Sequence, residues 1–345
     1  MEADWGVSAD IHLKLYNDSE YTGSGLPLKL FEILKTFRNM CLDMRSRNIK
    51  KVAILGDVND TKQFAAVDAF SVFRRVLESF PDIIFYIIPG NHDMTIANST
   101  TLKNQEGDDN DIWSSELRTA IDLLKGPQNV VTIEKPTVID NITFVPYSYI
   151  GEINNLETTD ILMSHFGLSD AVLSNGKSIR SSFKSKDLER WKTVFLGHYH
   201  KPQKLGNIYY VGNLMPLTRA EFNENKRYIC LNSDTLEVES VNTSGYRKYY
   251  EFIINDEEEI ETKLKEADDL KTAGNFVVVR NRTSNIINED ADGIKLINEF
   301  EEEFQTRGLS GKMSIEEQMK KYLEIEKISD RDCDEFFKIG LDIIN

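Results

Sequence analysis

The sequence predicts an α/β protein built from layers of helices and strands. Three observations support this fold class: short apolar runs rich in Val, Ile and Phe, helical patterns between the first of these runs, and a length of 345 residues. Such runs are typical of buried strands, and a strand, helix, strand order indicates α/β layers. Because single cores usually stop growing beyond about 250 to 300 residues, the length favours two or three domains.

Five apolar runs are expected to form strands, and two segments between the early runs are expected to form helices. The segment before Asp10 is a poorer strand candidate because Gly6 lies inside it. The later strands are expected to form a second sheet. The predicted strands cover residues 51–57, 82–93, 141–150, 160–166 and 192–200, and the predicted helices cover residues 26–44 and 64–80.

The composition indicates neither a membrane protein nor a secreted one. The longest apolar run, residues 83–88, is far shorter than the ~20 residues that span a bilayer. The amino-terminal sequence MEADWGVSAD has neither a basic region nor an apolar stretch. Cys41, Cys230 and Cys333 form no C-x-x-C motif, so neither a disulfide framework nor a thiolate zinc site is indicated. We expect a soluble protein of the cytoplasm with no membrane partner.

The net charge of −16 argues against a protein that coats nucleic acid by bulk electrostatics, although it leaves room for a local basic track. The acidity is uneven, since residues 246–345 contain 25 acidic and 15 basic residues. A domain boundary near Gly245 is therefore predicted.

The positions of the histidines suggest a shared ligand. The chain has five histidines, and all but His12 clearly lie where an apolar run ends. In α/β folds ligands gather at the carboxyl ends of strands. An isolated pair such as His198 and His200 is more often part of a loop, and a lone histidine is more often a core residue, but neither explanation suits the whole set. The set comprises His12, His92, His165, His198 and His200, with Asp10, Asp57 and Asn91 at similar places.

Imidazole, carboxylate and amide groups without thiolates favour a divalent ion such as manganese, with magnesium, iron and zinc as alternatives. The number of groups suffices for two metals that share one carboxylate. Two ions about 3.5 to 4 Å apart can clamp the attacking and leaving oxygens of an in-line displacement at phosphorus. Since bound metal lowers the pKa of water from 15.7 toward about 7, no side-chain nucleophile is required.

The order D-x-H, G-D, G-N-H-D, H, G-H-x-H between residues 10 and 200 resembles the calcineurin-like metallophosphoesterase superfamily. The resemblance implies a four-layer αββα sandwich with two divalent metals, most simply manganese. It implies that His92 contacts the phosphate and protonates the leaving oxygen. Asp60 and Asp93 also match the motifs, and we expect them to hold the ligand residues in place without binding metal themselves. The alternative is that each aspartate stabilises a turn or caps a helix. The implied ligands are Asp10, His12, Asp57 and His200 for one metal and Asp57, Asn91, His165 and His198 for the other.

The carboxyl-terminal third is predicted to form a small α/β cap followed by a helical tail. Residues 249–254, 257–270 and 275–281 have a strand, helix, strand pattern, and a helix is predicted over 293–304. After a linker, Ser314 and Glu317 form a capping box. The predicted domains are residues 1–245, 246–304 and 305–345, and the apolar faces of the last contain Ile315, Met319, Leu323, Phe336, Phe337 and Leu341.

This organisation resembles the SbcD-type nuclease subunit of the SbcCD double-strand-break processing complex and its bacteriophage counterparts. The resemblance implies that the terminal helix pair binds an SbcC-type ATPase of the SMC-like class, and that double-stranded DNA ends are the substrate. Packing of the helix pair on its own domain is the alternative.

Two further surfaces are predicted. A basic stretch lies between two metal motifs and is expected to hold DNA phosphates, with a solvated loop as the alternative; it contains Lys177, Arg180, Lys184 and Lys186.

The resemblance also implies a homodimer formed through early helices. The helix pattern over 64–80 is apolar enough to suggest one, with core packing as the alternative; its large apolar residues are Phe64, Phe70, Phe73, Val76 and Phe80.

The sequence therefore predicts a metal-dependent DNA nuclease subunit, with exonuclease or endonuclease action, that works with an SMC-like ATPase in DNA repair, recombination or replication. Two alternatives stay open. One is a stand-alone phosphodiesterase or phosphatase for small phosphoesters. The other is a scaffold that binds DNA ends without cutting them, which would have no need for His92.

Overall fold

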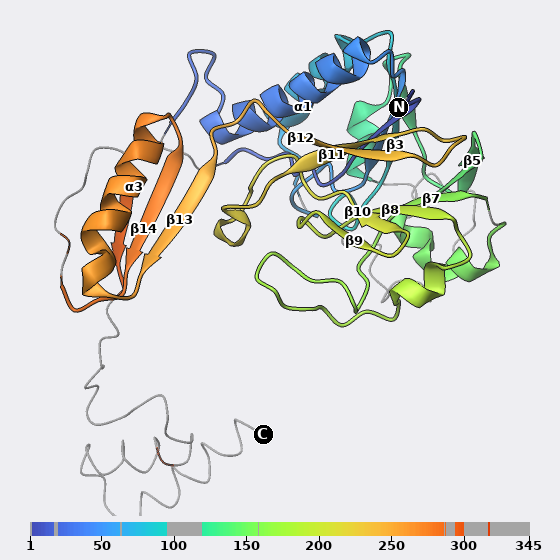
Figure 1. Ribbon diagram of the computed structural model, residues 1–345. Coiled ribbons are helices and arrows are strands. Elements are labelled where there is room, and N and C mark those ends of the chain that lie inside the picture. Colours follow the sequence, from blue (N-terminus) through green and yellow to red (C-terminus); the bar gives the residue numbers. More distant parts are fainter. Residues whose placement is uncertain are drawn as a thin grey trace, which may run out of the picture. The chain divides into compact units, whose positions relative to one another are not determined.

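Two six-stranded mixed sheets form the framework of a first compact unit, Met1–Tyr249 (Figure 1). In this computed structural model the described residues are 2–16, 20–62, 64–94, 119–157, 159–285, 287, 294–299 and 317. Within them, the strands and helices of the early chain alternate as the sequence predicts. The α/β fold class is confirmed by this arrangement.

The first sheet has the strand order β12-β11-β1-β2-β3-β4. Strands β1 to β4 are parallel, while β11 pairs antiparallel with β1 and with β12. Parallel strands end at the same edge, so the residues that follow β1, β2 and β3 meet there. The strands are β1 Trp5–Ser8, β2 Lys51–Leu55, β3 Ile84–Ile88, β4 Val130–Thr132, β11 Arg227–Leu231 and β12 Val238–Asn242.

Strand β1 forms in spite of Gly6, and the packing of α1 (Leu28–Ser46) explains the glycine. A Cβ atom at Gly6 would lie 2.6 Å from Cε of Met44 on α1. The missing side chain therefore lets the helix approach the sheet closely. Trp5 is paired on both sides, with Lys51 and with Leu231, so β1 is an interior strand.

The second sheet has the order β5-β6-β7-β8-β10-β9. Strands β6, β7, β8 and β10 are parallel, and the two outer strands are antiparallel to their neighbours. The strands are β5 Thr137–Ile139, β6 Ile142–Val145, β7 Ile161–His165, β8 Thr193–Gly197, β9 Gln203–Leu205 and β10 Ile208–Tyr210.

Helices and the two sheets stack in layers. Helices α1 and α2 (Val67–Glu78) pack on the first sheet, where the Phe37 ring lies 4.9 Å from Phe73 of α2 and 6.0 Å from Phe85 of β3. The core between the sheets includes Trp5 and Phe144, whose rings are 5.7 Å apart. The outer face of the second sheet is covered, among the described residues, by the 3-10 helices η5 (Tyr147–Asn155) and η6 (Ser185–Leu188).

The described part of the second unit, Tyr250–Asn345, contains a three-stranded sheet of order β13-β14-β15 and the helix α3. Its core joins Ile254, Val277 and Val279 to Ala267 of the helix. The predicted boundaries of three domains stay predictions. The elements are β13 Tyr249–Ile254, α3 Ile260–Thr272, β14 Phe276–Asn281 and β15 Ile294–Asn298.

The helix predicted over residues 293–304 is wrong for its described part, where β15 pairs parallel with β14. Ile294 and Leu296 pack into the small core, so the spacing of two that defines a strand face applies. Residues 300–304 and, apart from Glu317, the predicted terminal helices lie outside the described residues. The latter include Ile315, Met319, Leu323, Phe336, Phe337 and Leu341.

None of the helices described here combines the length and the apolar character that crossing a membrane requires.

Candidate metal centre

The predicted ligands gather at the carboxyl ends of the parallel strands of both sheets. They form two groups whose ligand atoms lie within 4.8 Å of one another in each group. The groups are Asp10, His12 and His200, which we call cluster 1, and Asp57, His165 and His198, which we call cluster 2.

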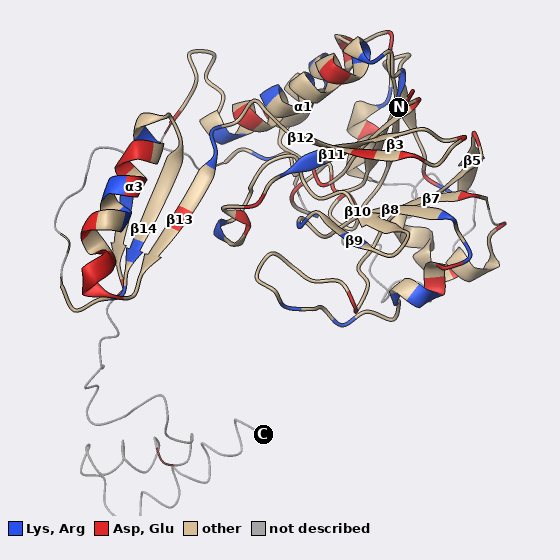
Figure 2. Ribbon diagram, in the orientation of Figure 1, with Lys and Arg blue, Asp and Glu red and all other residues tan. Residues whose placement is uncertain are grey.

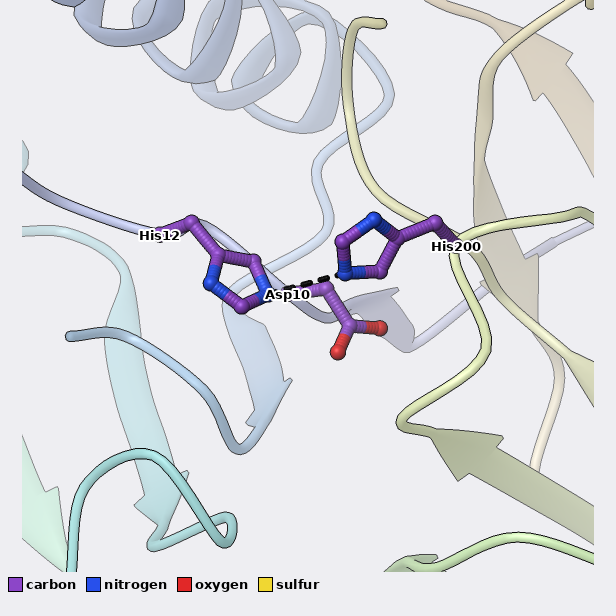
Figure 3. A group of neighbouring side chains, drawn as sticks. All are labelled: Asp10, His12 and His200. Carbon is purple, nitrogen blue, oxygen red and sulfur yellow. Dashed lines mark hydrogen bonds between the residues drawn. The ribbon is translucent and has the colours of Figure 1, made fainter. Parts of the chain in front are cut away.

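Cluster 1 joins the end of β1 to the turn that follows β8 (Figure 3). Nε2 of His12 lies 2.9 Å from Nε2 of His200, and the Asp10 carboxylate lies beside them. Nδ1 of His200 is 3.0 Å from Oε1 of Glu221, and Nδ1 of His12 is 3.5 Å from Oδ1 of Asp60. With each Nδ1 facing a carboxylate, the two Nε2 atoms can share one proton or bind one cation between them.

Cluster 2 is organised differently. Nδ1 of His165 donates a hydrogen bond to the carbonyl oxygen of Leu55 at 2.8 Å. Nε2 of His165 then faces Oδ1 of Asn91 at 3.1 Å and Oδ2 of Asp57 at 3.2 Å. His198 presents Nδ1 instead, 2.8 Å from the same Asn91 oxygen. Imidazole nitrogens, a carboxylate oxygen and an amide oxygen, all possible metal ligands, therefore converge on one point.

Asp57 belongs to cluster 2 and also approaches cluster 1. Its Oδ2 atom is 3.2 Å from Nε2 of His165 in cluster 2 and 3.9 Å from Nε2 of His12 in cluster 1. Its Oδ1 atom accepts the backbone N–H of His92 at 2.8 Å. One carboxylate thus reaches both sets of imidazoles, as a bridging ligand must.

The electrostatics of both clusters favour a cation. Burial raises the pKa of Asp10, because its charge lacks a full counter-charge. Burial alone would lower the pKa of His165, but the charge of Asp57 and their hydrogen bond raise it to about 9. The same pair holds the pKa of Asp57 below its ordinary value despite burial. The raised pKa values of Asp10 and His165 mean that positive charge is favoured where a metal ion would bind. Buried charged groups of this kind commonly coordinate metals.

His198 is suited to a neutral ligand role. Burial, followed by the charge of His165, lowers the pKa of His198 to about 3, so its ring carries a free lone pair at neutral pH. The donor set of carboxylate, imidazole and amide oxygen, without thiolate, fits hard to borderline divalent ions. The residues present therefore fit a dinuclear centre.

The backbone is strained where the ligands leave the strands. The residues Asp10, His12, Asp57 and His198 have φ values of 54°, 52°, 50° and 89°. Such conformations cost about 1–3 kcal/mol each and cluster at functional sites. The strand predicted over residues 192–200 ends earlier than expected, at Gly197, because His198 has a positive φ. Tyr199 is buried, and its hydroxyl donates to the Leu168 carbonyl at 3.0 Å.

His92 borders both clusters without belonging to either. Its Nδ1 atom forms a short hydrogen bond with the Asp60 carbonyl oxygen, and its ring lies 5.2 Å from the His12 ring. With Nδ1 occupied, Nε2 is left to exchange a proton with a ligand. The Asp60 carboxylate approaches His12, and Lys14 lies 2.9 Å from it.

Asp93 and Asn59 hold the loops that carry the ligands. The Asp93 carboxylate accepts the backbone N–H of Gly90 and of Asn59, both at 2.8 Å. Burial, with the nearby charge of Asp57, raises its pKa to about 7. Asn59 is buried and its side chain donates to the Phe64 carbonyl at 3.1 Å, so the polar residue at this position closes a turn.

The predicted DNA-binding residues lie on the loop between β7 and β8, and all four are exposed. Figure 2 shows Lys and Arg positions along this loop in blue. The loop is anchored at Phe183, whose ring lies 5.2 Å from Phe166 and whose carbonyl accepts the Ser169 N–H at 2.9 Å. Contact between the four basic residues of this loop and DNA stays a prediction. The residues are Lys177, Arg180, Lys184 and Lys186.

Two features of the site have no signal in the sequence, the Glu221 carboxylate at His200 and the Leu55 carbonyl at His165. Gly197 is part of the G-H-x-H motif, and the structure explains it, because a Cβ atom there would lie 2.7 Å from Nδ1 of His165.

Comparison with known proteins agrees with this geometry. Residues 6–202 match the calcineurin-like phosphoesterase family. Exonuclease subunit 1 of Enterobacteria phage T4 is 24% identical to the chain over 214 residues, which cover 56% of this chain and 57% of that protein. The chain thus spans little more than half the length of this relative.

Two solved structures show distant likeness. An archaeal phosphodiesterase matches with a TM-score of 0.33 and 10% identity, covering 69% of this chain and 98% of the other. The nuclease MPE of Pseudomonas putida matches with a TM-score of 0.29 and 11% identity, covering 69% and 88%. The family match, by contrast, spans both clusters and more than half of the chain, and the protein therefore belongs to the calcineurin-like phosphoesterase family.

Proposed function

We propose that this protein is a metal-dependent DNA nuclease subunit that hydrolyses phosphodiester bonds at duplex ends. The observation that carries the proposal is the pair of clusters that Asp57 connects, with His92 beside both. This arrangement suits hydrolysis of a phosphoester, and the phage exonuclease subunit among its relatives favours a nucleic acid as the substrate. The choice of duplex DNA follows from the resemblance to SbcD-type nucleases.

In this proposal each cluster binds one divalent ion, most simply Mn²⁺, with Mg²⁺ as the alternative. Asp57 would be a ligand in common to both ions, and Asn91 would join the ligands of cluster 2. Ions held there would lower the pKa of a water molecule and neutralise charge on the phosphate.

The protein's own side chains hold the segments of the site together and provide a proton. Asp10 accepts the backbone N–H of His198 at 3.0 Å, which ties the turn after β8 to the end of β1. His92 has its Nδ1 atom fixed by the Asp60 carbonyl, so Nε2 can hold a proton for the leaving oxygen. A positioned general acid of this kind contributes about 10²- to 10⁴-fold to the rate.

The partners are part of the proposal. The exposed basic loop between β7 and β8 would hold DNA phosphates, and the segment from residue 305 would bind an SMC-like ATPase of the SbcC type. A homodimer would form through the early helices. Phe70, Phe73 and Phe80 are buried in the protein's own core, but Phe64 and Val67 are 74% and 77% exposed and are free for such a contact. The setting would be the cytoplasm of a bacterial or phage-infected cell.

The test is digestion of an end-labelled linear duplex by the full chain with Mn²⁺, comparing wild type with His92→Ala, and with a chromogenic phosphodiester in parallel. Duplex cutting that is lost in the variant while bound metal is kept would support the proposal. Turnover of the small ester alone, with the ATPase partner present as well as absent, would favour a small-molecule phosphodiesterase. Duplex binding without cutting under both conditions would favour a scaffold.

A further inference from the structure

Glu221 is a buried carboxylate directly behind cluster 1. It ends the 3-10 helix η7 (Arg219–Glu221), beyond the family match at residues 6–202, and is 2% exposed. Its Oε1 atom lies 3.0 Å from Nδ1 of His200. The other ring nitrogen, Nε2, faces His12 inside the cluster.

Both oxygens of the Glu221 carboxylate have more than one polar partner. Oε1 also accepts the Thr218 hydroxyl at 2.9 Å. Oε2 accepts hydrogen bonds from Nδ2 of Asn213 at 2.6 Å and from the Leu217 N–H at 3.2 Å, and it forms an ion pair with Nζ of Lys226 at 3.0 Å. A carboxylate held by so many donors keeps its charge and cannot rotate away from His200.

Lys226 supplies the counter-charge and links this network to the backbone of the site. Its side chain is 0% exposed, and Nζ contacts Oε2 of Glu224 at 2.8 Å as well as Glu221. Nζ also donates to the carbonyl oxygen of His200 at 3.0 Å. The ring and the main chain of His200 are therefore both fixed by one buried ion pair.

We infer that Glu221 is a positioning residue for the metal site of cluster 1: it holds the proton on Nδ1 of His200 and aims the lone pair of Nε2 at the ion. A carboxylate behind a ligand histidine fixes its tautomer and raises its basicity. Cluster 2 uses a neutral group for the same purpose, the Leu55 carbonyl at His165. Loss of Glu221 should therefore weaken one metal site and spare the other. This inference rests on the metal centre proposed above.

The test is Mn²⁺ binding to the full chain by calorimetry, with electron paramagnetic resonance to detect coupled ion pairs. The variant is Glu221→Gln, and the matched control is Glu224→Gln, which removes a charge from the same lysine but from a residue without contact to His200. We expect two bound ions in wild type and in the control. In Glu221→Gln one of the two should bind about 10- to 100-fold more weakly, with loss of the coupled signal.

The outcomes separate the two proposals. Wild-type protein that binds no Mn²⁺ refutes the metal centre itself. Two ions bound with wild-type affinity by Glu221→Gln refute the positioning role alone, as does an equal loss in Glu224→Gln. Should Glu221→Gln fail to fold, nitrogen-15 spectra of zinc-loaded wild-type protein decide: His200 protonated at Nδ1 supports the inference, and His200 protonated at Nε2 overturns it.

Discussion

The Nε2 atoms of His12 and His200 lie 2.9 Å apart although 188 positions separate the two residues in the chain. Strand β1 of the first sheet and strand β8 of the second end near this point, so side chains from the segments that follow them meet. Each ring has its second nitrogen near a carboxylate, which leaves the pair to bind a single positive charge. The stability of the fold should therefore depend on the ion held there.

Removal of metal is expected to lower the melting temperature. A ligand that binds only the folded state at about 100 times its Kd stabilises by about 2.7 kcal/mol, so added Mn²⁺ should restore the loss after chelation. Scanning calorimetry of the chelated and the reloaded protein measures this change in melting temperature. The double variant His165→Ala/His200→Ala is the control and should show no metal-dependent shift; equal shifts in both proteins would contradict a metal centre at these clusters.

Substitution of Asp57 is expected to affect both metal ions, whereas substitution of His12 is expected to affect one. Asp57 Oδ2 approaches imidazoles of both clusters, but His12 belongs to cluster 1 alone. Metal content after gel filtration with Mn²⁺ should therefore fall from two ions to none in Asp57→Asn and to one in His12→Ala. Equal stoichiometry in the two variants would show that Asp57 is not shared.

Much of this site could be predicted from the sequence, because short motifs at strand ends fix which side chains leave the sheet. Asp10, Asp57 and His165 each lie at or just beyond the end of a parallel strand, and such ends share one edge. Glu221 could not be found in this way. It reaches His200 from 21 positions away, and the local sequence TRAEF resembles any polar surface turn.

The error over residues 293–304 has a similar cause. Ile294 and Ile297 are spaced as on a helix face, while Ile294 and Leu296 are spaced as on a strand face. The local spacing is therefore compatible with a helix and with a strand. The segment forms a strand because it pairs with Val277 and Val279 of β14. Pairing between distant segments is tertiary information that one sequence does not contain.

Gly197→Ala is expected to disrupt cluster 2. The added Cβ would lie 2.7 Å from Nδ1 of His165 and would collide with the Leu55 carbonyl that fixes this ring. Overpacking of this kind costs about 1–3 kcal/mol, and the displaced imidazole should bind metal more weakly. Urea unfolding and metal content measure the two effects. Gly151→Ala is the matched control, since nothing lies within 4 Å of its added Cβ; similar losses in both variants would refute the packing argument.

Charged substitutions at Phe64 and Val67 are expected to convert a dimer into a monomer. Both side chains are largely exposed, so Phe64→Glu/Val67→Glu should leave the melting temperature nearly unchanged. Light scattering of wild type and variant measures the mass. Val138, 51% exposed on β5, provides the control substitution Val138→Glu. A monomer mass for wild type, or a dimer mass for the double variant, would contradict the proposed interface.

Neutralisation of the basic loop is expected to reduce the salt dependence of DNA binding without affecting the metals. Its four basic side chains are exposed, and no described contact ties them to cluster 1 or cluster 2. Each phosphate contact adds about 0.9 to the slope of log K against log salt, so replacement of all four by Gln should flatten it by up to that amount per contact. Fluorescence anisotropy with a labelled duplex at several salt concentrations gives the slope. The control replaces four exposed basic residues elsewhere, Lys35, Lys50, Arg75 and Lys265, which makes the same change in net charge. If both sets lower the slope equally, only the overall charge matters, and the loop is not the DNA-binding surface.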